Sequence, residues 1–158
     1  MSYDFNADDI FEIAEQLERN GAKFYNNAAD SIADPASKAF LLMLADMEVE
    51  HEKTFHAVRA TLAGKEKDPT VFDPQDEAVL YLKALADTRV FFEKEISVIS
   101  MKEILKSAIE AEKDSIVFYL GIKDAVPEKS GRNKIEAIIK EEMGHIRLLS
   151  KELVGLQK

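Results

Sequence analysis

The sequence contains no cysteine, and it has only six glycines and four prolines in 158 residues. Without cysteine the chain can form no disulfide, no zinc finger and no thiolate-bound iron centre. Few glycines and prolines, together with many alanine, leucine, glutamate and lysine residues, are typical of a helical protein. A chain of this length can bury about two-thirds of its unfolded surface, so a single domain over residues 1–158 is expected.

Long hydrophobic runs and positive charge are also scarce. No apolar run reaches the roughly 18 residues of a membrane span, and the segment MSYDFNADD at the N-terminus is acidic. We therefore expect a cytoplasmic protein with no membrane partner. The net charge of -9 disfavours nucleic acid as a partner, because its phosphates would be repelled.

The spacing of apolar residues predicts four long amphipathic helices. We expect them at about residues 6–32, 35–63, 100–126 and 130–156. Asp34 followed by Pro35 predicts the start of the second helix, because aspartate is a good N-cap and proline suits the first helical position. Ser100 and Glu103 form a capping-box pattern at the start of the third helix.

Residues 64–99 interrupt the helical pattern and form a connector of some 36 residues. A connector of this length is not a tight turn, and it is expected to contain a short helix from Asp73 to about Ala86. Phe91 and Phe92 in this segment are expected either to cap the bundle or to form a homodimer contact. We expect a homodimer.

The second pair of helices repeats the first at a constant offset, since 112 − 18 = 94 and 145 − 51 = 94. The offset relates the pairs Glu18/Glu112, Phe24/Phe118, Tyr25/Tyr119, Glu48/Glu142 and His51/His145. The chain therefore indicates a duplicated helical hairpin. We expect an all-α, ferritin-like antiparallel four-helix bundle with one long crossover, whose halves are related by a pseudo-twofold axis.

Six ionisable residues interrupt the apolar stripes, near the middle of each helix. They are Glu18, Glu48, His51, Glu112, Glu142 and His145. Each bare carboxylate in a dry core would cost several kcal/mol, and four together would also repel one another. The pattern therefore predicts a compensating positive charge.

Two divalent metal ions meet this requirement. A glutamate and a histidine three residues apart on one helix project from the same face, so both can reach one ion. Each ion can then have one histidine and one terminal glutamate, while the other two glutamates bridge the pair. Oxygen-rich ligands with one nitrogen suit iron or manganese. The alternative is a buried network of salt bridges and hydrogen bonds without metal.

Four further residues lie on the same stripes close to the six. Tyr25 and Tyr119 each follow a glutamate of the set by seven residues, so they are expected to hydrogen-bond a bridging carboxylate, to carry an electron or proton, or simply to be core tyrosines. Gly21 and Ser115 either leave open space for an oxidant or allow close helix packing.

The remaining candidates are expected to have ordinary roles. His56 lies off the stripe and is predicted to be a surface residue. Met43 and Met47 are predicted to be core residues together with four phenylalanines, Phe24, Phe40, Phe55 and Phe118. Six glutamates near the motifs are predicted to point into solvent: Glu12, Glu15, Glu50, Glu52, Glu110 and Glu141.

The segments LERNGAKFY, MEVEHEKTF, IEAEKDSIVFY and KEEMGHI together resemble the di-iron domain of the rubrerythrin branch of the ferritin-like superfamily. The resemblance covers nearly the whole chain and implies two iron ions. It also implies terminal carboxylates at Glu18 and Glu112, bridging carboxylates at Glu48 and Glu142, and imidazole ligands at His51 and His145. Rubrerythrins characteristically reduce hydrogen peroxide with electrons from a rubredoxin-type centre.

The chain departs from rubrerythrins in two ways. It lacks the four-cysteine rubredoxin module, so an external donor such as a rubredoxin-like protein is expected. It has Ser115 where typical rubrerythrins carry an extra carboxylate, which leaves six protein ligands, as in the ferroxidase centre of bacterioferritins. Three hypotheses result: an oxidoreductase that reduces peroxide or dioxygen, a ferroxidase that assembles into a cage, and a structural protein whose site has decayed. A manganese or mixed-metal pair would use the same ligand types.

Overall fold

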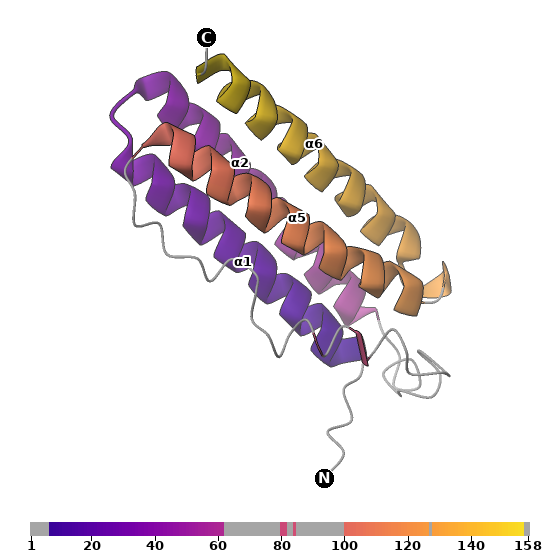
Figure 1. Cartoon of the computed structure of the whole chain (residues 1–158). Helices are drawn as coiled ribbons and strands as arrows, with labels where there is room; N and C mark the ends of the chain where they lie inside the picture. The colour runs from indigo at the N-terminus through magenta and orange to yellow at the C-terminus, as the bar shows by residue number, and fades with distance from the viewer. Residues whose placement is uncertain (1–6, 62–79, 82–83, 85–99, 127, 157–158) are drawn as a thin grey trace.

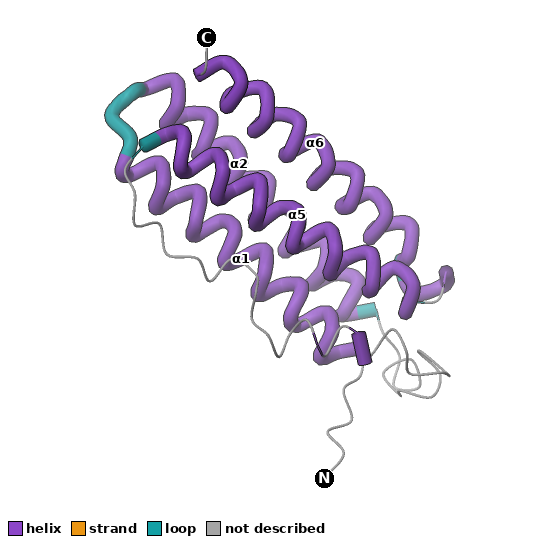
Figure 2. The backbone as a smooth tube through the Cα atoms, viewed as in Figure 1, coloured by secondary structure: helices purple, strands orange, loops and turns teal. Residues whose placement is uncertain are grey.

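The computed structural model describes residues 7–61, 80–81, 84, 100–126 and 128–156. Four long helices make up most of these residues: α1 (Ala7–Ser31), α2 (Pro35–Ala60), α5 (Met101–Ala125) and α6 (Arg132–Leu156). A short 3-10 helix, η1 (Glu128–Ser130), precedes α6. The described ranges contain no strand, as Figure 2 shows, so the predicted all-α fold class is confirmed.

The four long helices lie side by side in one bundle (Figure 1). The hairpin of α1 and α2 turns at residues 32–34, and the hairpin of α5 and α6 turns at the opposite end. Since α5 begins near the turn between α1 and α2, α2 and α5 run in the same direction. These directions are those of the predicted bundle with one long crossover, and the crossover itself lies mostly outside the described residues.

The hydrophobic core is divided into two clusters, one at each end of the bundle. One cluster joins the first halves of α1 and α6 to the second halves of α2 and α5, with Phe11, Phe55 and Ile122 fully buried. The other joins the remaining halves, with Leu44 and Leu105 fully buried. The six ionisable residues of the stripes lie between the two clusters.

Side-chain caps fix the starts of α2 and α5 where the sequence predicts them. Asp34 has an extended backbone and accepts a hydrogen bond from the Ser37 amide at 2.9 Å, and Pro35 is the first helical residue. Ser100 accepts a hydrogen bond from the Glu103 amide at 3.2 Å. These bonds satisfy backbone donors that have no partner inside the helix.

The helix bounds differ from the predicted ones where turns intervene. Helix α2 ends at Ala60 rather than residue 63, and α6 begins at Arg132 because η1 and Gly131 precede it. Gly131 has a φ of 99°, a left-handed conformation that favours glycine. The predicted short helix from Asp73 to Ala86 lies largely outside the described residues, as do Phe91 and Phe92. None of the described helices is long and apolar enough to cross a membrane.

Candidate metal centre

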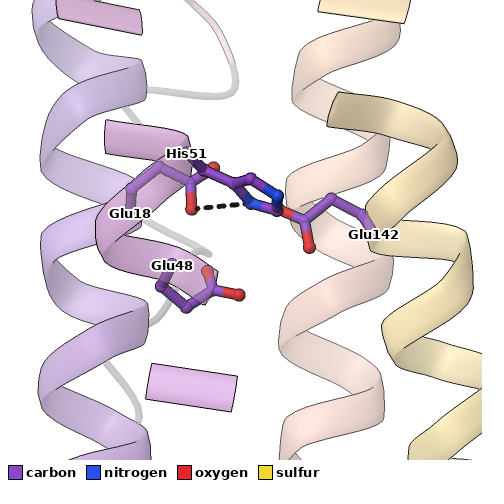
Figure 3. Close-up of side chains that lie close together, drawn as sticks. All are labelled: Glu18, Glu48, His51 and Glu142. Atoms are coloured by element: carbon purple, nitrogen blue, oxygen red, sulfur yellow. Dashed lines mark hydrogen bonds and ion pairs between the residues drawn. The ribbon is translucent and has the colours of Figure 1, made fainter. Parts of the chain in front are cut away.

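The six ionisable residues predicted from the stripes meet at the middle of the bundle. Helices α1 and α5 each supply one glutamate, while α2 and α6 each supply a glutamate and a histidine. Glu18, Glu48, Glu112, Glu142 and both histidines are at most 2% exposed. Figure 3 shows four of these side chains pointing toward one another between the helices. The structure thus brings together the whole predicted set.

The donor atoms form two overlapping groups in which every donor lies within 4.8 Å of the others. The first group consists of Glu18, Glu48, His51 and Glu142, and the second of Glu48, Glu112, Glu142 and His145. Glu48 and Glu142 therefore belong to both groups, whereas Glu18 and Glu112 belong to one each. This geometry has the pattern of two bridging and two terminal carboxylates.

The carboxylate of Glu142 lies between the two histidines. Its Oε1 is 3.2 Å from His51 Nδ1, and its Oε2 is 2.8 Å from His145 Nδ1. Glu48 Oε1 is 3.2 Å from His145 Nδ1. The imidazole rings are nearly parallel, with 18° between their planes and 5.4 Å between their centroids. Both rings therefore present Nδ1 to the carboxylates.

Many of these close donor atoms make no hydrogen bond. Within the described residues, the buried side-chain atoms without a hydrogen-bond partner include one oxygen from each of the four glutamates and both nitrogens of His145. His145 Nδ1 is near three carboxylates, yet it is aligned for a hydrogen bond with none of them. Buried polar atoms normally have partners. Buried donor atoms that lie close together without hydrogen-bonding one another suit a pair of metal ions.

Burial and neighbouring charges raise the pKa values of two glutamates of the cluster, and contacts with carboxylates raise those of both histidines. Burial and the neighbouring charges of Glu112 and Glu18 raise the pKa of Glu142 to about 8. Burial, and then the charge of Glu142, likewise raises the pKa of Glu48 well above its ordinary value. Burial would lower the pKa of His51, but contacts with Glu142 and Glu18 outweigh it and raise the pKa to about 11. The pKa of His145 is raised to about 9 for the same kind of reason, with Glu112 and Glu142 opposing burial.

The two tyrosines on the stripes each support a carboxylate from the other hairpin. Tyr25 donates a hydrogen bond to Glu112 Oε1 at 2.6 Å, and Tyr119 donates one to Glu18 Oε1. Both hydroxyls are buried, and burial raises both pKa values well above the ordinary value. Of the three alternatives for these tyrosines, the hydrogen bond to a bridging carboxylate is wrong, because the acceptors are the glutamates that belong to a single donor group.

Gly21 and Ser115 occupy equivalent positions on α1 and α5. A Cβ atom on Gly21 would lie 2.7 Å from Glu48 Oε2, so the glycine makes room for that carboxylate. Ser115 is 1% exposed, and its Oγ has no hydrogen-bond partner among the described residues. At Gly21, close approach to a carboxylate thus explains the small residue.

Glu141 is a candidate residue of the centre that the sequence prediction missed. Its side chain is 54% exposed, as expected of a solvated glutamate, but Oε2 lies 2.6 Å from His51 Nε2. A carboxylate on the outer nitrogen of a ligand histidine orients the ring. Glu141 lies three residues after Ile138 and four before His145, which places it at the edge of the buried stripe. That spacing was the available signal.

The predictions for two other side chains are wrong, and those for His56 and Glu50 are among the confirmed ones. Glu15 was expected in solvent but is 4% exposed, because Arg59 Nη1 lies 3.1 Å from its Oε2 and compensates its charge. Met43 was expected in the core but is 43% exposed, and it lines a surface groove beside α2. His56 and Glu50 lie at the surface as predicted, with side chains 74% and 68% exposed.

Replacing Gly21 with alanine tests the close approach of Glu48. The added methyl group would meet Glu48 Oε2, so we expect Gly21→Ala to weaken metal binding by about 10–100-fold. The α1 helix itself should not suffer, since alanine is the better helix former. Calorimetric titration with Co²⁺ measures the affinity, and Ser115→Ala at the equivalent position is the control. Unchanged affinity in Gly21→Ala would refute the steric argument.

The raised pKa values predict how the stability of chelator-treated protein depends on pH. In the folded chain Glu142 keeps its proton until about pH 8, because its pKa is raised to about 8. His145 and His51 keep theirs until about pH 9 and about pH 11. Unfolding lets all three groups release these protons at lower pH. The folded state therefore binds more protons than the unfolded state, and its stability should fall as pH rises from about 5 to 9. Thermal unfolding at several pH values measures this trend, and a rise of Tm over the range would contradict it.

Comparison with known proteins supports this description of the fold. The sequence matches no family model and no curated protein. Among solved structures it is similar to a chain from Thermotoga maritima that is provisionally described as a ferritin-like diiron-carboxylate protein. The two chains are 26% identical, the TM-score is 0.69, and the match covers 97% of each chain. The chain thus has the ferritin-like fold, and this likeness supports its place in the ferritin-like superfamily.

Proposed function

We propose that this chain is a non-haem di-iron oxidoreductase that reduces hydrogen peroxide, or dioxygen, with electrons from an external donor. The observation that carries the proposal is the pair of buried donor groups that share Glu48 and Glu142. The Thermotoga protein of the same fold is described as a diiron-carboxylate protein, which supports iron as the metal. The ligand types suit manganese or a mixed pair as well.

The proposed reaction needs two electrons at one O–O bond. Reduction of H₂O₂ to two water molecules consumes two electrons and two protons, and a donor protein such as a rubredoxin-like protein would return the electrons. Two iron ions, when bound, would supply this redox chemistry. The chain's own residues bind and orient: four carboxylates balance the charge of the ions, and Tyr25 and Tyr119 hold the terminal glutamates in place.

A surface groove reaches one residue of this centre. The groove lies between α2 and α6 and is lined by residues that include His51, Glu50, Lys53, Lys134 and Glu141. Although His51 is only 2% exposed, it forms part of the groove's lining. A small oxidant could therefore approach the centre from the side of His51, while the two hydrophobic clusters close the ends of the bundle.

The alternative function is a ferroxidase of the ferritin type. It is favoured by the count of six protein ligands, with Ser115 buried at the position of the extra rubrerythrin carboxylate. A ferroxidase used for storage would assemble into a cage, whereas we propose a homodimer for the oxidoreductase. Light scattering separates the two assemblies by particle size.

Removal of either shared carboxylate should abolish the metal pair. We expect Glu48→Ala and Glu142→Ala to bind fewer than two iron ions per chain, because each deletes a donor from both groups. Glu50→Ala is the matched control, since Glu50 lies on the same helix as Glu48 but pairs with Lys53 at the surface. Iron quantitation after anaerobic loading measures the stoichiometry. If Glu48→Ala and Glu142→Ala each still bind two iron ions per chain, the proposed metal centre is refuted.

The choice of oxidant distinguishes the proposed function from its alternative. The iron-loaded protein is reduced without oxygen and mixed with peroxide or with dioxygen in a stopped-flow instrument. Oxidation by peroxide that is faster by at least about tenfold, a barrier difference of about 1.4 kcal/mol, is expected for the peroxidase. Faster oxidation by dioxygen, together with a large particle, would favour the ferroxidase.

A further inference from the structure

The two histidines of the centre differ on their outer side. His51 Nε2 lies 2.6 Å from Glu141 Oε2, whereas His145 Nε2 has no hydrogen-bond partner among the described residues. The duplication explains the difference, because the position equivalent to Glu141 is 141 − 94 = 47, which is a methionine. The Glu141 carboxylate thus contacts one histidine, and the thioether of Met47 occupies the equivalent sequence position on the other hairpin.

The inner side of the centre does not show this difference. Each histidine presents Nδ1 to the carboxylates, and each donor group contains one histidine, one terminal glutamate and the two shared ones. The tyrosine hydroxyls also obey the offset, since Tyr25 bonds Glu112 and Tyr119 bonds Glu18. The two donor groups therefore match on the inner side, and Glu141 adds a negative charge only on the outer side of His51.

An outer carboxylate changes what a ligand histidine can do. When Nδ1 binds a metal ion, the ring proton is on Nε2, so His51 donates a hydrogen bond to Glu141. This bond fixes the ring orientation and makes the imidazole a more basic ligand. Met47 offers only a weak thioether acceptor, so His145 gains no equivalent support. The ion beside His51 should therefore be held more tightly than the ion beside His145.

We propose that Glu141 is a positioning residue that makes the two metal positions unequal, with the His51 position the tighter one. The inference rests on the proposed di-metal function. Glu141 is suited to this role without being part of the packed core, because its side chain is 54% exposed in the groove between α2 and α6. Its replacement leaves no buried cavity, so metal affinity can change while the fold does not.

The test is a calorimetric titration of the chelator-treated full chain with Co²⁺, followed also by the cobalt absorption spectrum. The unaltered protein should bind two ions in two separable steps. Glu141→Ala should weaken the tighter step by about 10–100-fold and leave the other step unchanged. Glu141→Gln keeps a hydrogen-bond acceptor without the charge, so its loss should be smaller. Glu50→Ala, in the same groove, should change neither step.

Two further variants test the route through the histidines. In a His51→Ala background, the effect of Glu141→Ala should disappear, because the contact acts only through that ring. Met47→Glu should strengthen the weaker step by giving His145 a carboxylate partner. Thermal unfolding of metal-free Glu141→Ala and Glu141→Gln should match the unaltered protein, which separates a positioning effect from a loss of fold.

The outcomes distinguish this inference from the proposed function. If the unaltered chain binds fewer than two Co²⁺ ions, the di-metal function fails. If it binds two ions and the affinities of Glu141→Ala and Glu141→Gln equal those of the unaltered protein, the inference alone is overturned. Equal weakening of both steps by Glu141→Ala would also overturn it, because the effect would not be confined to the His51 position.

Discussion

The rest of the structure depends on the burial of four carboxylates in one layer of a helical core. Glu18, Glu48, Glu112 and Glu142 are at most 1% exposed, and the two histidines are the cationic side chains that face them within the described residues. Burial and mutual repulsion raise the pKa values of Glu48 and Glu142, so these two carboxyls keep protons that glutamates normally release. Two imidazoles cannot balance four negative charges. A pair of divalent ions would remove this imbalance.

The position of this polar layer explains the division of the core. The clusters on either side contain large apolar residues such as Phe11 and Phe55 at one end and Leu41 and Leu44 at the other. Since α1 and α5 run in opposite directions, residues related by the offset of 94 lie in opposite clusters, as Phe24 and Phe118 do. In the middle layer, by contrast, residues related by the offset lie together, as Glu48 and Glu142 do.

The duplication also shows where the two halves differ. Tyr25 and Tyr119 each cross to the other hairpin, and this exchange ties the halves together through the carboxylates. Gly21 leaves room for the Glu48 carboxylate, while Ser115 occupies the equivalent position on α5. Glu141 contacts His51, while Met47 stands at its equivalent place. The inner donors are therefore paired, and the departures from symmetry surround them.

The sequence by itself determined the helices, the duplication and the six residues of the central layer, because helical periodicity places residues three or four apart on one face. The caps at Asp34 and Ser100 were equally local and equally predictable. Only the tertiary structure decided that Glu141 reaches His51, that Glu15 is buried against Arg59, and which carboxylate each tyrosine bonds. These contacts join residues far apart in the chain. Periodicity along one helix carries no information about the distance between side chains on two different helices.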